Sequence, residues 1–330
     1  MMIASRIRLA IALGLAHLTA GAVADTVDIR EWLVPWENAG PTDPYLDARG
    51  RVWFISPRGD FVGNFSPDSA EFNRYDLRKG TAPAALLVDG NRNIWYASGK
   101  RRHIGMLNPG TGRVTEFEMP DRQAKDLRTL VFDRTGDLWF TAQAGNFVGR
   151  LRLSDSTIDL VPVPTRKSGP FGIAVNSRSE LWVAASQRNA LIHVDPVNMS
   201  VTEIATPHED SRLRRLVVTS DDRVWYADYA LGSLGRYDPR SGQFSEWPMP
   251  GGTGSRPFGM TVDRDDRIWV IETGRVPNRL IAFDTKTTSF LTETDIPSGA
   301  GSVSQLFYAE WSGEIWFGTE SNYVGRARVH

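Results

Sequence analysis

The chain has 330 residues, a formal net charge of −1 at pH 7 and no cysteine. The near-neutral charge gives no bulk attraction to nucleic acid or to an anionic membrane, and the lack of cysteine excludes disulfides, thiolate catalysis and cysteine metal sites. We expect a monomer that has no membrane span and binds no nucleic acid.

The first 24 residues have the features of a cleaved secretory signal peptide. A positively charged start precedes residues 9–18, an apolar run that is too short to span a bilayer. A small-x-small cleavage site follows at residues 22–24. We expect residues 1–24 to be removed on export, so that residues 25–330 form a single domain that is periplasmic or secreted.

Residues 25–330 repeat one short pattern seven times. Each copy contains runs of about four residues bounded by Asn, Ser, Gly, Asp or Pro, as residues 169–207 show best. The second run of every copy holds a tryptophan, and these tryptophans lie 42 to 47 residues apart: Trp53, Trp95, Trp139, Trp182, Trp225, Trp269 and Trp316. Four short strands per copy predict an all-β fold, a seven-bladed β-propeller with four-stranded blades. We expect the tryptophans to fill the spaces between blades, because one blade alone is too small to bury both of its faces.

The two ends of the chain complement each other. Residues 29–32 match the fourth strands of other copies, whereas the last copy supplies residues 323–329 as its third strand and then stops. We therefore expect residues 27–34 to pair with this third strand and complete the last blade. Such closure removes the exposed strand edges that an open array would carry.

Each copy begins 12 residues before its tryptophan, at the start of the innermost strand. Ligands of propellers generally bind at the channel mouth where these strands begin. The residues one place past each start are therefore expected to face the mouth: Thr42, Ala84, Arg128, Phe171, Arg214, Phe258 and Gln305. A second set, just past each tryptophan strand, is expected nearby: Ser56, Ser98, Ala142, Ala185, Asp228, Glu272 and Glu320.

The repeated phrase resembles that of the virginiamycin B (streptogramin B) lyases. The resemblance is carried best by PFGI at residues 170–173 and PFGM at 257–260, with LWFT at 138–141 and VGR at 148–150. It covers residues 25–330 in all seven copies. It implies a propeller lyase that opens a cyclic depsipeptide without water. In such an enzyme a general base takes the proton α to the ester carbonyl, and a magnesium ion polarises that carbonyl.

The resemblance also implies positions for the catalytic groups. The general base, a histidine in the family, falls at Gln305, and a metal-binding carboxylate two residues earlier falls at Val303. A substrate-contacting histidine falls at Phe258, and an aromatic hydroxyl falls at Thr42. Of these family groups, only the second metal carboxylate is kept, as Glu320.

Three carboxylates of adjacent blades are the candidate metal ligands and bases. Asp228, Glu272 and Glu320 are expected along one side of the mouth, where they could hold Mg²⁺ or Ca²⁺. Glu320 and Glu272 are the metal candidates. In an altered lyase, Glu272 or Asp228 could instead act as the base, with Arg128 as the electrophile. The alternative is that these carboxylates cap turns or pair with arginines.

The opposite side of the mouth is basic and aromatic. Arg128 and Arg214 flank Phe171, and Phe258 and Gln305 complete the candidate ligand-binding set. Two guanidinium groups beside an aromatic face suit an anionic, partly flat ligand. Together with the acidic side, the pattern favours a zwitterionic or peptide-like small molecule. The alternative is that the arginines pair with the carboxylates across the channel.

Three functions remain open at this stage. The first is a lyase of the streptogramin type, a metal-assisted carbon–oxygen lyase with altered acid–base residues. The second is a non-catalytic propeller that binds a ligand or partner, and the third is a lactonase-like metal-dependent hydrolase. Whether the chain is an enzyme depends on a competent base, so a carboxylate with a raised pKa at the mouth would favour the enzyme.

Overall fold

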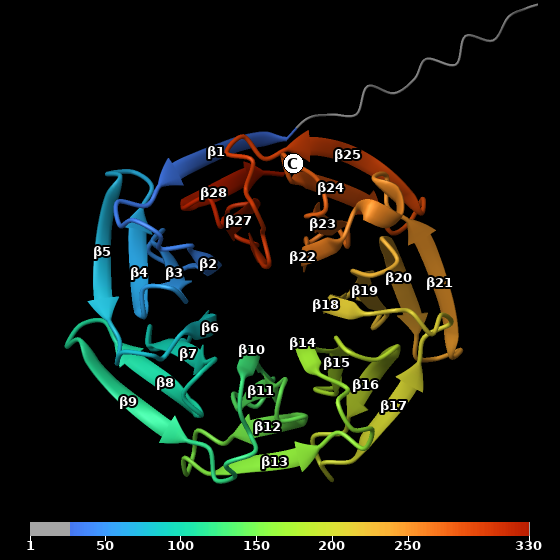
Figure 1. Cartoon of the computed structure of the whole chain (residues 1–330), viewed down its shortest axis with the longest axis horizontal. Helices are drawn as coiled ribbons and strands as arrows, with labels where there is room; N and C mark the ends of the chain where they lie inside the picture. The colour runs from blue at the N-terminus through green and yellow to red at the C-terminus, as the bar shows by residue number, and fades with distance from the viewer. Residues whose placement is uncertain (1–26, 330) are drawn as a thin grey trace, which may run out of the picture.

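The computed structural model describes residues 27–329, which form seven four-stranded antiparallel sheets arranged as blades around a central channel (Figure 1). The predicted seven-bladed propeller is thereby confirmed. The predicted signal peptide, residues 1–24, lies outside the described residues. Within residues 27–329 no helix is long and apolar enough to cross a membrane.

In blades 1 to 6 the strands follow one another in chain order from the channel outward. Blades 1 to 3 comprise β2 (Thr42–Leu46), β3 (Val52–Ser56), β4 (Phe61–Ser66), β5 (Glu71–Asp76), β6 (Pro83–Val88), β7 (Ile94–Ser98), β8 (His103–Asn108), β9 (Arg113–Glu118), β10 (Leu127–Phe132), β11 (Leu138–Ala142), β12 (Phe147–Leu151) and β13 (Ile158–Pro162). Blades 4 and 5 comprise β14 (Pro170–Val175), β15 (Leu181–Ala185), β16 (Ala190–Val194), β17 (Val201–Ala205), β18 (Leu213–Val218), β19 (Val224–Asp228), β20 (Ser233–Asp238) and β21 (Gln243–Pro248).

Blade 6 and blade 7 complete the ring (Figure 1). They comprise β22 (Pro257–Val262), β23 (Ile268–Glu272), β24 (Arg279–Asp284), β25 (Ser289–Asp295), β26 (Leu306–Ala309), β27 (Glu314–Gly318), β28 (Tyr323–Arg328) and β1 (Asp28–Leu33). A short 3-10 helix, η1 (Gly252–Gly254), precedes blade 6.

The N-terminal strand closes the ring as the sequence predicts. β1 pairs antiparallel with β28, from Asp28 opposite Arg328 to Leu33 opposite Tyr323. The ring of Trp32 stacks on Trp316 at 5.8 Å between centroids, so closure also buries aromatic surface. Blade 7 therefore combines β1 with the last three strands, and it has four strands like the other blades.

The repeated tryptophans lie in the hydrophobic cores between neighbouring blades. Trp139 is fully buried, and its indole N–H donates to the Oδ2 atom of Asp133 at 2.7 Å. Asp133 also accepts backbone N–H groups through Oδ1, so one carboxylate fixes the turn and satisfies the buried indole. The same aspartate six residues before the tryptophan recurs in four blades: Asp47, Asp89, Asp133 and Asp263.

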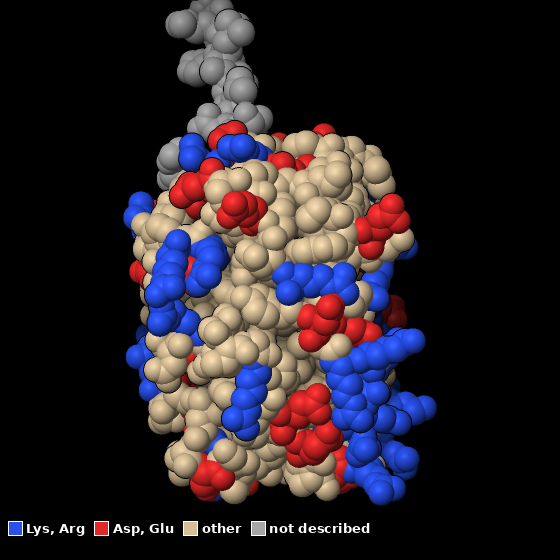
Figure 2. All heavy atoms as spheres, turned by 90° about the vertical axis from the view of Figure 1, so that its left-hand side faces the viewer, with Lys and Arg blue, Asp and Glu red and all other residues tan. Residues whose placement is uncertain are grey.

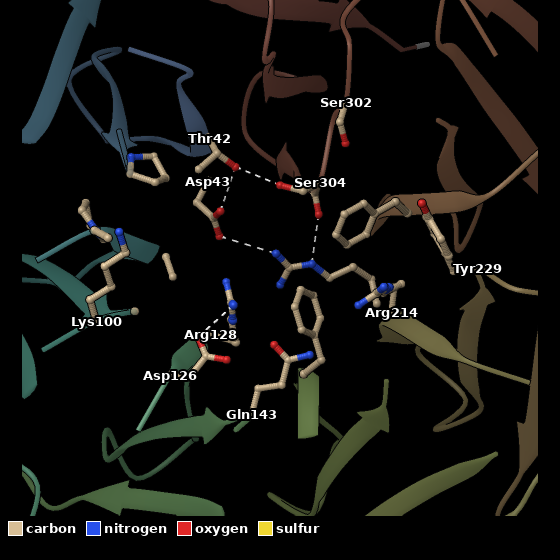
Figure 3. A pocket seen from close by; sticks show the side chains of 18 residues that line it. Thr42, Asp43, Lys100, Asp126, Arg128, Gln143, Arg214, Tyr229, Ser302 and Ser304 are labelled. Carbon is tan, nitrogen blue, oxygen red and sulfur yellow. Dashed lines mark hydrogen bonds and ion pairs between the residues drawn. The ribbon is translucent and has the colours of Figure 1, made fainter. Parts of the chain in front are cut away.

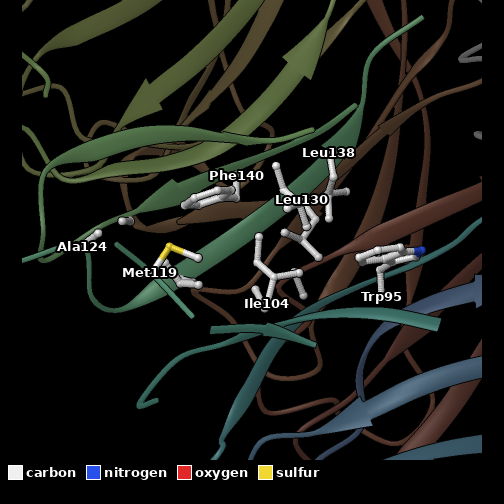
Figure 4. Packing of buried hydrophobic residues seen from close by; sticks show 12 residues of the cluster. Trp95, Ile104, Met119, Ala124, Leu130, Leu138 and Phe140 are labelled. Atoms are coloured by element: carbon white, nitrogen blue, oxygen red, sulfur yellow. The ribbon is translucent and has the colours of Figure 1, made fainter. Parts of the chain in front are cut away.

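Figure 4 shows one of these cores, between blades 2 and 3. Trp95 and Ile104 come from blade 2, and Leu130 and Phe140 come from blade 3. Burial of each large side chain contributes roughly 1.5–3 kcal/mol relative to leaving it in water. A glycine is required at position 149 in the third strand of blade 3, because a Cβ there would lie 2.1 Å from the ring of Phe140.

Bulges near the start of most innermost strands determine which side chains face the channel. In β18 the pairing register shifts between Leu213 and Leu216, so Arg214 and Arg215 lie within the bulge. A bulge interrupts the alternation of side chains between the two faces of a strand. Both arginines therefore line the channel although they are consecutive.

Blade 7 departs from the predicted register. One residue more separates Tyr308 from its partner Ile315 than separates Val262 from Ile268 in blade 6. The longer turn means that the blade begins one place earlier than a fixed offset from the tryptophan predicts. Ser304, rather than Gln305, is the blade 7 residue that corresponds to Arg214.

The outer surface has no dominant charge on the side seen in Figure 2, which carries β5 and β9. Basic and acidic side chains are interspersed there among uncharged residues. This pattern agrees with the formal net charge of −1.

Candidate functional site

A pocket of about 470 Å³ opens at the channel mouth (Figure 3). Its walls come from the starts of the innermost strands and from the loops beside them. The lining residues are Thr42, Asp43, Pro57, Ala82, Pro83, Ala84, Gly99, Lys100, Asp126, Arg128, Gln143, Phe171, Arg214, Arg215, Tyr229, Phe258, Ser302 and Ser304. Four cationic side chains thus face two carboxylates, so the pocket carries a net positive charge.

The starts of the innermost strands supply two successive layers of residues along the channel. The layer nearer the opening is the mouth layer, and the strand registers assign to it Thr42, Ala84, Arg128, Phe171, Arg214, Phe258 and Ser304. The floor layer consists of the residues that follow them: Asp43, Ala85, Thr129, Gly172, Arg215, Gly259 and Gln305. The sequence predicts the first layer apart from blade 7, and it gives no indication of the second.

Arg214 is the central side chain of the mouth layer. Its guanidinium carbon lies 4.9 Å from the ring centre of Tyr229 and 5.7 Å from those of Phe171 and Phe258. Burial lowers the pKa of Arg214, and the nearby charge of Arg128 adds to this effect. No carboxylate of residues 27–329 forms an ion pair with Arg214, and its Nε atom has no hydrogen-bond partner there. The cation is therefore partly desolvated and surrounded by aromatic faces.

A second arginine borders the pocket on the blade 3 side. The Nη2 atom of Arg128 lies 2.8 Å from Oδ1 of Asp126, and its side chain is 38% exposed. Gln143 lies beside this pair in Figure 3 and donates its amide to Ser186 at 2.8 Å. Lys100 adds a further cation from blade 2.

Arg215 forms the floor of the pocket and links four blades across the channel. Its Nε atom donates to the carbonyl of Ser304 at 3.0 Å, and its Nη1 atom donates to the hydroxyl of Thr129 at 2.8 Å. Its Nη2 atom lies 3.8 Å from Oδ1 of Asp43. Arg215 is only 5% exposed, and it also borders a second cavity that opens further along the inner strands. It therefore separates the mouth pocket from the rest of the channel.

Asp43 is the carboxylate at the floor that sequence reasoning missed. It lies in the bulge of β2 with φ of 48°, a left-handed conformation that Asp tolerates better than most residues. Burial raises its pKa, and the charge of Arg215 and a hydrogen bond from Thr42 oppose this rise. The only available signal was its position directly after Thr42. A buried carboxyl group with a raised pKa in a pocket has the properties of a general base.

The structure brings four of the predicted ligand-binding residues together. Arg128, Phe171, Arg214 and Phe258 all line the mouth pocket. Gln305 does not, because the longer turn of blade 7 places it in the floor layer, where it borders the second cavity. Ser304 lies at the mouth instead, and its hydroxyl is 3.0 Å from that of Thr42. The mouth position of blade 7, where the family resemblance implies a catalytic histidine, therefore holds a serine, which carries neither an imidazole nor a carboxylate.

The two predicted bases lie behind the pocket wall. Asp228 is fully buried, and its Oδ1 accepts the backbone N–H groups of Arg212, Ala230 and Leu231 at 3.1–3.2 Å. Glu272 is also fully buried, and its Oε2 accepts two hydrogen bonds from Arg279, at 2.7 and 3.0 Å. Neither carboxylate lines the mouth pocket, and Oδ2 of Asp228 has no hydrogen-bond partner among residues 27–329.

The predicted metal ligands Glu272 and Glu320 differ in burial and in their partners. The second oxygen of Glu272 accepts the N–H of Gly251 at 2.7 Å, whereas Glu320 is 57% exposed and lies 4.0 Å from Arg58. Among residues 27–329, the only three-residue cluster with metal-ligand geometry lies elsewhere, on blade 2. The family's magnesium therefore does not fit the donors that the mouth presents, which are dominated by arginines and hydroxyl groups.

The fold and this channel mouth define a seven-bladed propeller with a cationic, aromatic pocket. The sequence matches the model of the virginiamycin B lyase family over residues 15–278 and again over 157–330. The chain therefore belongs to the virginiamycin B lyase family.

Relatives of known name agree with this assignment. A virginiamycin B lyase from Nocardia farcinica is 28% identical over 207 residues, which cover 62% of this chain and 69% of the relative. The crystal structure of virginiamycin B lyase from Staphylococcus aureus matches with a TM-score of 0.83 and 21% identity, covering 92% of this chain and all of that one. A catalytically inactive variant of that lyase, solved with quinupristin, matches equally well.

The fold is shared with proteins of other kinds. The extracellular domain of a putative hybrid two-component system from Bacteroides thetaiotaomicron matches with a TM-score of 0.72 and 14% identity, covering 92% of this chain and 43% of that one. At such identities the likeness shows the fold alone. Function must therefore be argued from the pocket.

Proposed function

We propose that this chain is an exported binding protein of the virginiamycin B lyase family, which holds an anionic, partly flat small molecule at its channel mouth. The observation that carries this proposal is Arg214, a partly buried cation among three aromatic rings with no ion-paired carboxylate in the described chain. A buried charge without a partner is costly, and a ligand carboxylate would offset that cost.

The pocket residues divide the work of recognition. Phe171, Tyr229 and Phe258 offer faces for a flat ring, while Arg214 provides forked donors for a carboxylate. Arg128 and Lys100 add positive charge at the rim of the pocket. Asp126 can accept a hydrogen bond from an N–H group of a zwitterionic or peptide-like ligand. Arg215 is already hydrogen-bonded, so it shapes the floor.

Binding of N-acetyl-phenylalanine and of its neutral amide tests this proposal. Calorimetric titration should show saturable binding of the acid and at least tenfold weaker binding of the amide. The substitution Arg214→Gln should abolish the difference between the two probes. Arg236→Gln is a matched control, because the guanidinium carbon of Arg236 lies 5.5 and 5.4 Å from the ring centres of Trp225 and Trp247, but Arg236 does not line the pocket. Equal binding of acid and amide by the unmodified chain would contradict the proposal.

A second candidate is a lyase in which Asp43 is the base. Its support is that Asp43 lies in the pocket, that burial raises its pKa and that cations lie beside it. In that reaction Asp43 would take a proton from carbon, the released electron pair would form a C=C bond, and the ester C–O bond would break. The departing oxygen would leave as a carboxylate that Arg214 or Arg128 could bind.

Mass spectrometry separates the three functions. After incubation with quinupristin, an elimination opens the ring without changing its mass, whereas a hydrolase adds one water. A lyase that uses Asp43 should lose activity in Asp43→Asn by about 10² to 10⁴-fold. An unchanged, unopened substrate would leave the binding function as the supported one for this compound.

A further inference from the structure

The outer hairpin of blade 2 carries a cluster of polar side chains far from the channel mouth. In the pairing of β8 with β9, His103 lies directly opposite Glu118, and Gly105 lies opposite Glu116. Residues two apart on a strand share a face, so the histidine and both glutamates project from the same side of the hairpin. Their nitrogen and carboxylate oxygen atoms all lie within 4.8 Å of one another.

The histidine at the centre of this cluster is buried without a hydrogen bond. His103 is 0% exposed, and neither of its ring nitrogens has a hydrogen-bond partner within residues 27–329. Its Nε2 atom points to Oε1 of Glu116 at 3.7 Å, which is beyond hydrogen-bond length. Burial lowers the pKa of His103, against the opposing effect of Glu116 and Glu118. An imidazole nitrogen without a hydrogen-bond partner is available to bind a metal ion.

A tyrosine beside the histidine is also unsatisfied. The hydroxyl of Tyr96 is buried and has no hydrogen-bond partner in the described part of the chain. The ring of Tyr96 stands edge-on to His103 at 5.9 Å between centroids, and burial and the charge of Glu116 raise its pKa. Several unpaired polar groups in one small volume indicate a ligand that satisfies them.

Blade 5 repeats this framework with its hydrogen bonds made. Tyr226 corresponds to Tyr96, and its hydroxyl donates to Oε1 of Glu246 at 2.9 Å. Ser233 and Pro248 stand at the positions of the histidine and the second glutamate, so blade 5 lacks those two ligands. The unsatisfied groups of blade 2 therefore come from residues particular to that blade, not from the repeat.

We propose that His103, Glu116 and Glu118 bind a divalent transition-metal ion, with Zn²⁺ as the best match, on the outer hairpin of blade 2. One imidazole nitrogen and two carboxylates form a set that zinc accepts, and three protein ligands leave one coordination position open. Ligands about 2.0–2.2 Å from zinc lie roughly 3.3 Å apart, so a small contraction of the cluster suffices.

Neighbouring cations do not block this site. The Nη1 atom of Arg78 lies 3.5 Å from Oε2 of Glu116, the oxygen that does not face the histidine, and Arg78 is 59% exposed. Arg101 donates its Nε to the carbonyl of Lys79, and its charge acts on His103 from nearby, as that of Arg78 does. Arg78 thus pairs with one oxygen of Glu116, and the oxygen that faces His103 forms no ion pair with an arginine of residues 27–329.

Calorimetric titration of the untagged full chain with Zn²⁺ tests the proposal, with Co²⁺ absorption as a second readout. We expect saturable binding of one ion, visible Co²⁺ bands of a four-coordinate site, and weaker binding as pH falls and protons compete. His103→Gln and Glu118→Gln should each raise the zinc Kd at least tenfold. Glu118→Gln changes an exposed side chain, so it tests the site without disturbing the core.

His208→Gln is the matched control, because His208 and Glu246 lie 2.9 Å apart on blade 5 and could hold an adventitious ion. Zinc binding that survives His208→Gln and weakens in Glu118→Gln supports the blade 2 site. Absence of saturable binding by the unmodified chain would overturn the proposal. So would binding that is unchanged in both His103→Gln and Glu118→Gln.

Discussion

Asp228 and Glu272 end β19 and β23, and Arg214 lies near the start of β18. The three residues occupy neighbouring positions of the same repeat, but their surroundings differ. Glu272 is fully buried and pairs with Arg279, and Asp228 is fully buried and accepts backbone N–H groups through Oδ1, while its Oδ2 has no hydrogen-bond partner among residues 27–329. Arg214 faces the pocket with aromatic neighbours and no ion-paired carboxylate among the described residues. Charge alone therefore does not identify a functional residue in this repeat. Two properties distinguish Arg214 from Glu272: it lines the pocket, and residues 27–329 supply it with no partner of opposite charge.

The largest expected effect of breaking this comparison is on stability. Glu272→Ala removes the buried carboxylate that pairs with Arg279 and accepts the N–H of Gly251, and it leaves Arg279, whose side chain is only 12% exposed, with the more exposed Glu293 as its remaining carboxylate partner among residues 27–329. We expect the free energy of unfolding to fall by about 3–5 kcal/mol, as for other broken buried ion pairs. Urea denaturation of the variant measures it. A loss below about 1 kcal/mol would show that Glu272 is not structural.

The complementary change at the mouth should affect binding and spare stability. Arg214→Gln removes a charged donor worth about 1.5–3 kcal/mol to a bound carboxylate, so the affinity for N-acetyl-phenylalanine should fall by tenfold or more. The melting temperature should not fall, because no ion pair to a carboxylate of the described chain is lost. If Arg214→Gln bound the acid with normal affinity but had a lower melting temperature, Arg214 would be a structural residue and the contrast with Glu272 would be wrong.

The pH dependence of stability sharpens the comparison at Asp43. Burial raises its folded-state pKa above 3.8, so the folded chain keeps this proton to a higher pH than the unfolded chain does. Between these two pKa values the free energy of unfolding should fall as pH rises. Asp43→Asn should remove this fall, so the variant should gain stability relative to the unmodified chain with rising pH. Urea denaturation at several pH values measures the difference, and parallel profiles would contradict the raised pKa.

The smallest effect is expected at Glu320. Its side chain is 57% exposed and its one ion pair within residues 27–329, to Arg58, spans 4.0 Å, so Glu320→Ala should change stability by less than about 0.5 kcal/mol. Thermal-shift titration with Mg²⁺ and Ca²⁺ checks the metal at the same time. A magnesium-dependent rise in Tm that disappears in Glu320→Ala would restore this residue as a metal ligand.

The sequence by itself determined the architecture. The regular spacing of the tryptophans, the short strands between turn residues and the spare N-terminal strand led to the seven blades and to the pairing of β1 with β28. These features depend on local patterns that repeat many times, so one irregular copy cannot hide them. The mouth positions of Arg128, Phe171 and Arg214 followed from the same periodicity.

Tertiary structure decided which polar residues are free to act. The bulges that bring Asp43 and Arg215 to the pocket floor and the longer turn that moves Gln305 from the mouth are register changes without a sequence signature. Two further features depend on how the strands of a blade pack in three dimensions. They are the burial of Glu272 against Arg279 and the lack of hydrogen-bond partners within residues 27–329 for the ring nitrogens of His103. Periodicity fixes where a side chain lies in its blade, whereas its hydrogen-bond partners depend on neighbours that differ from blade to blade.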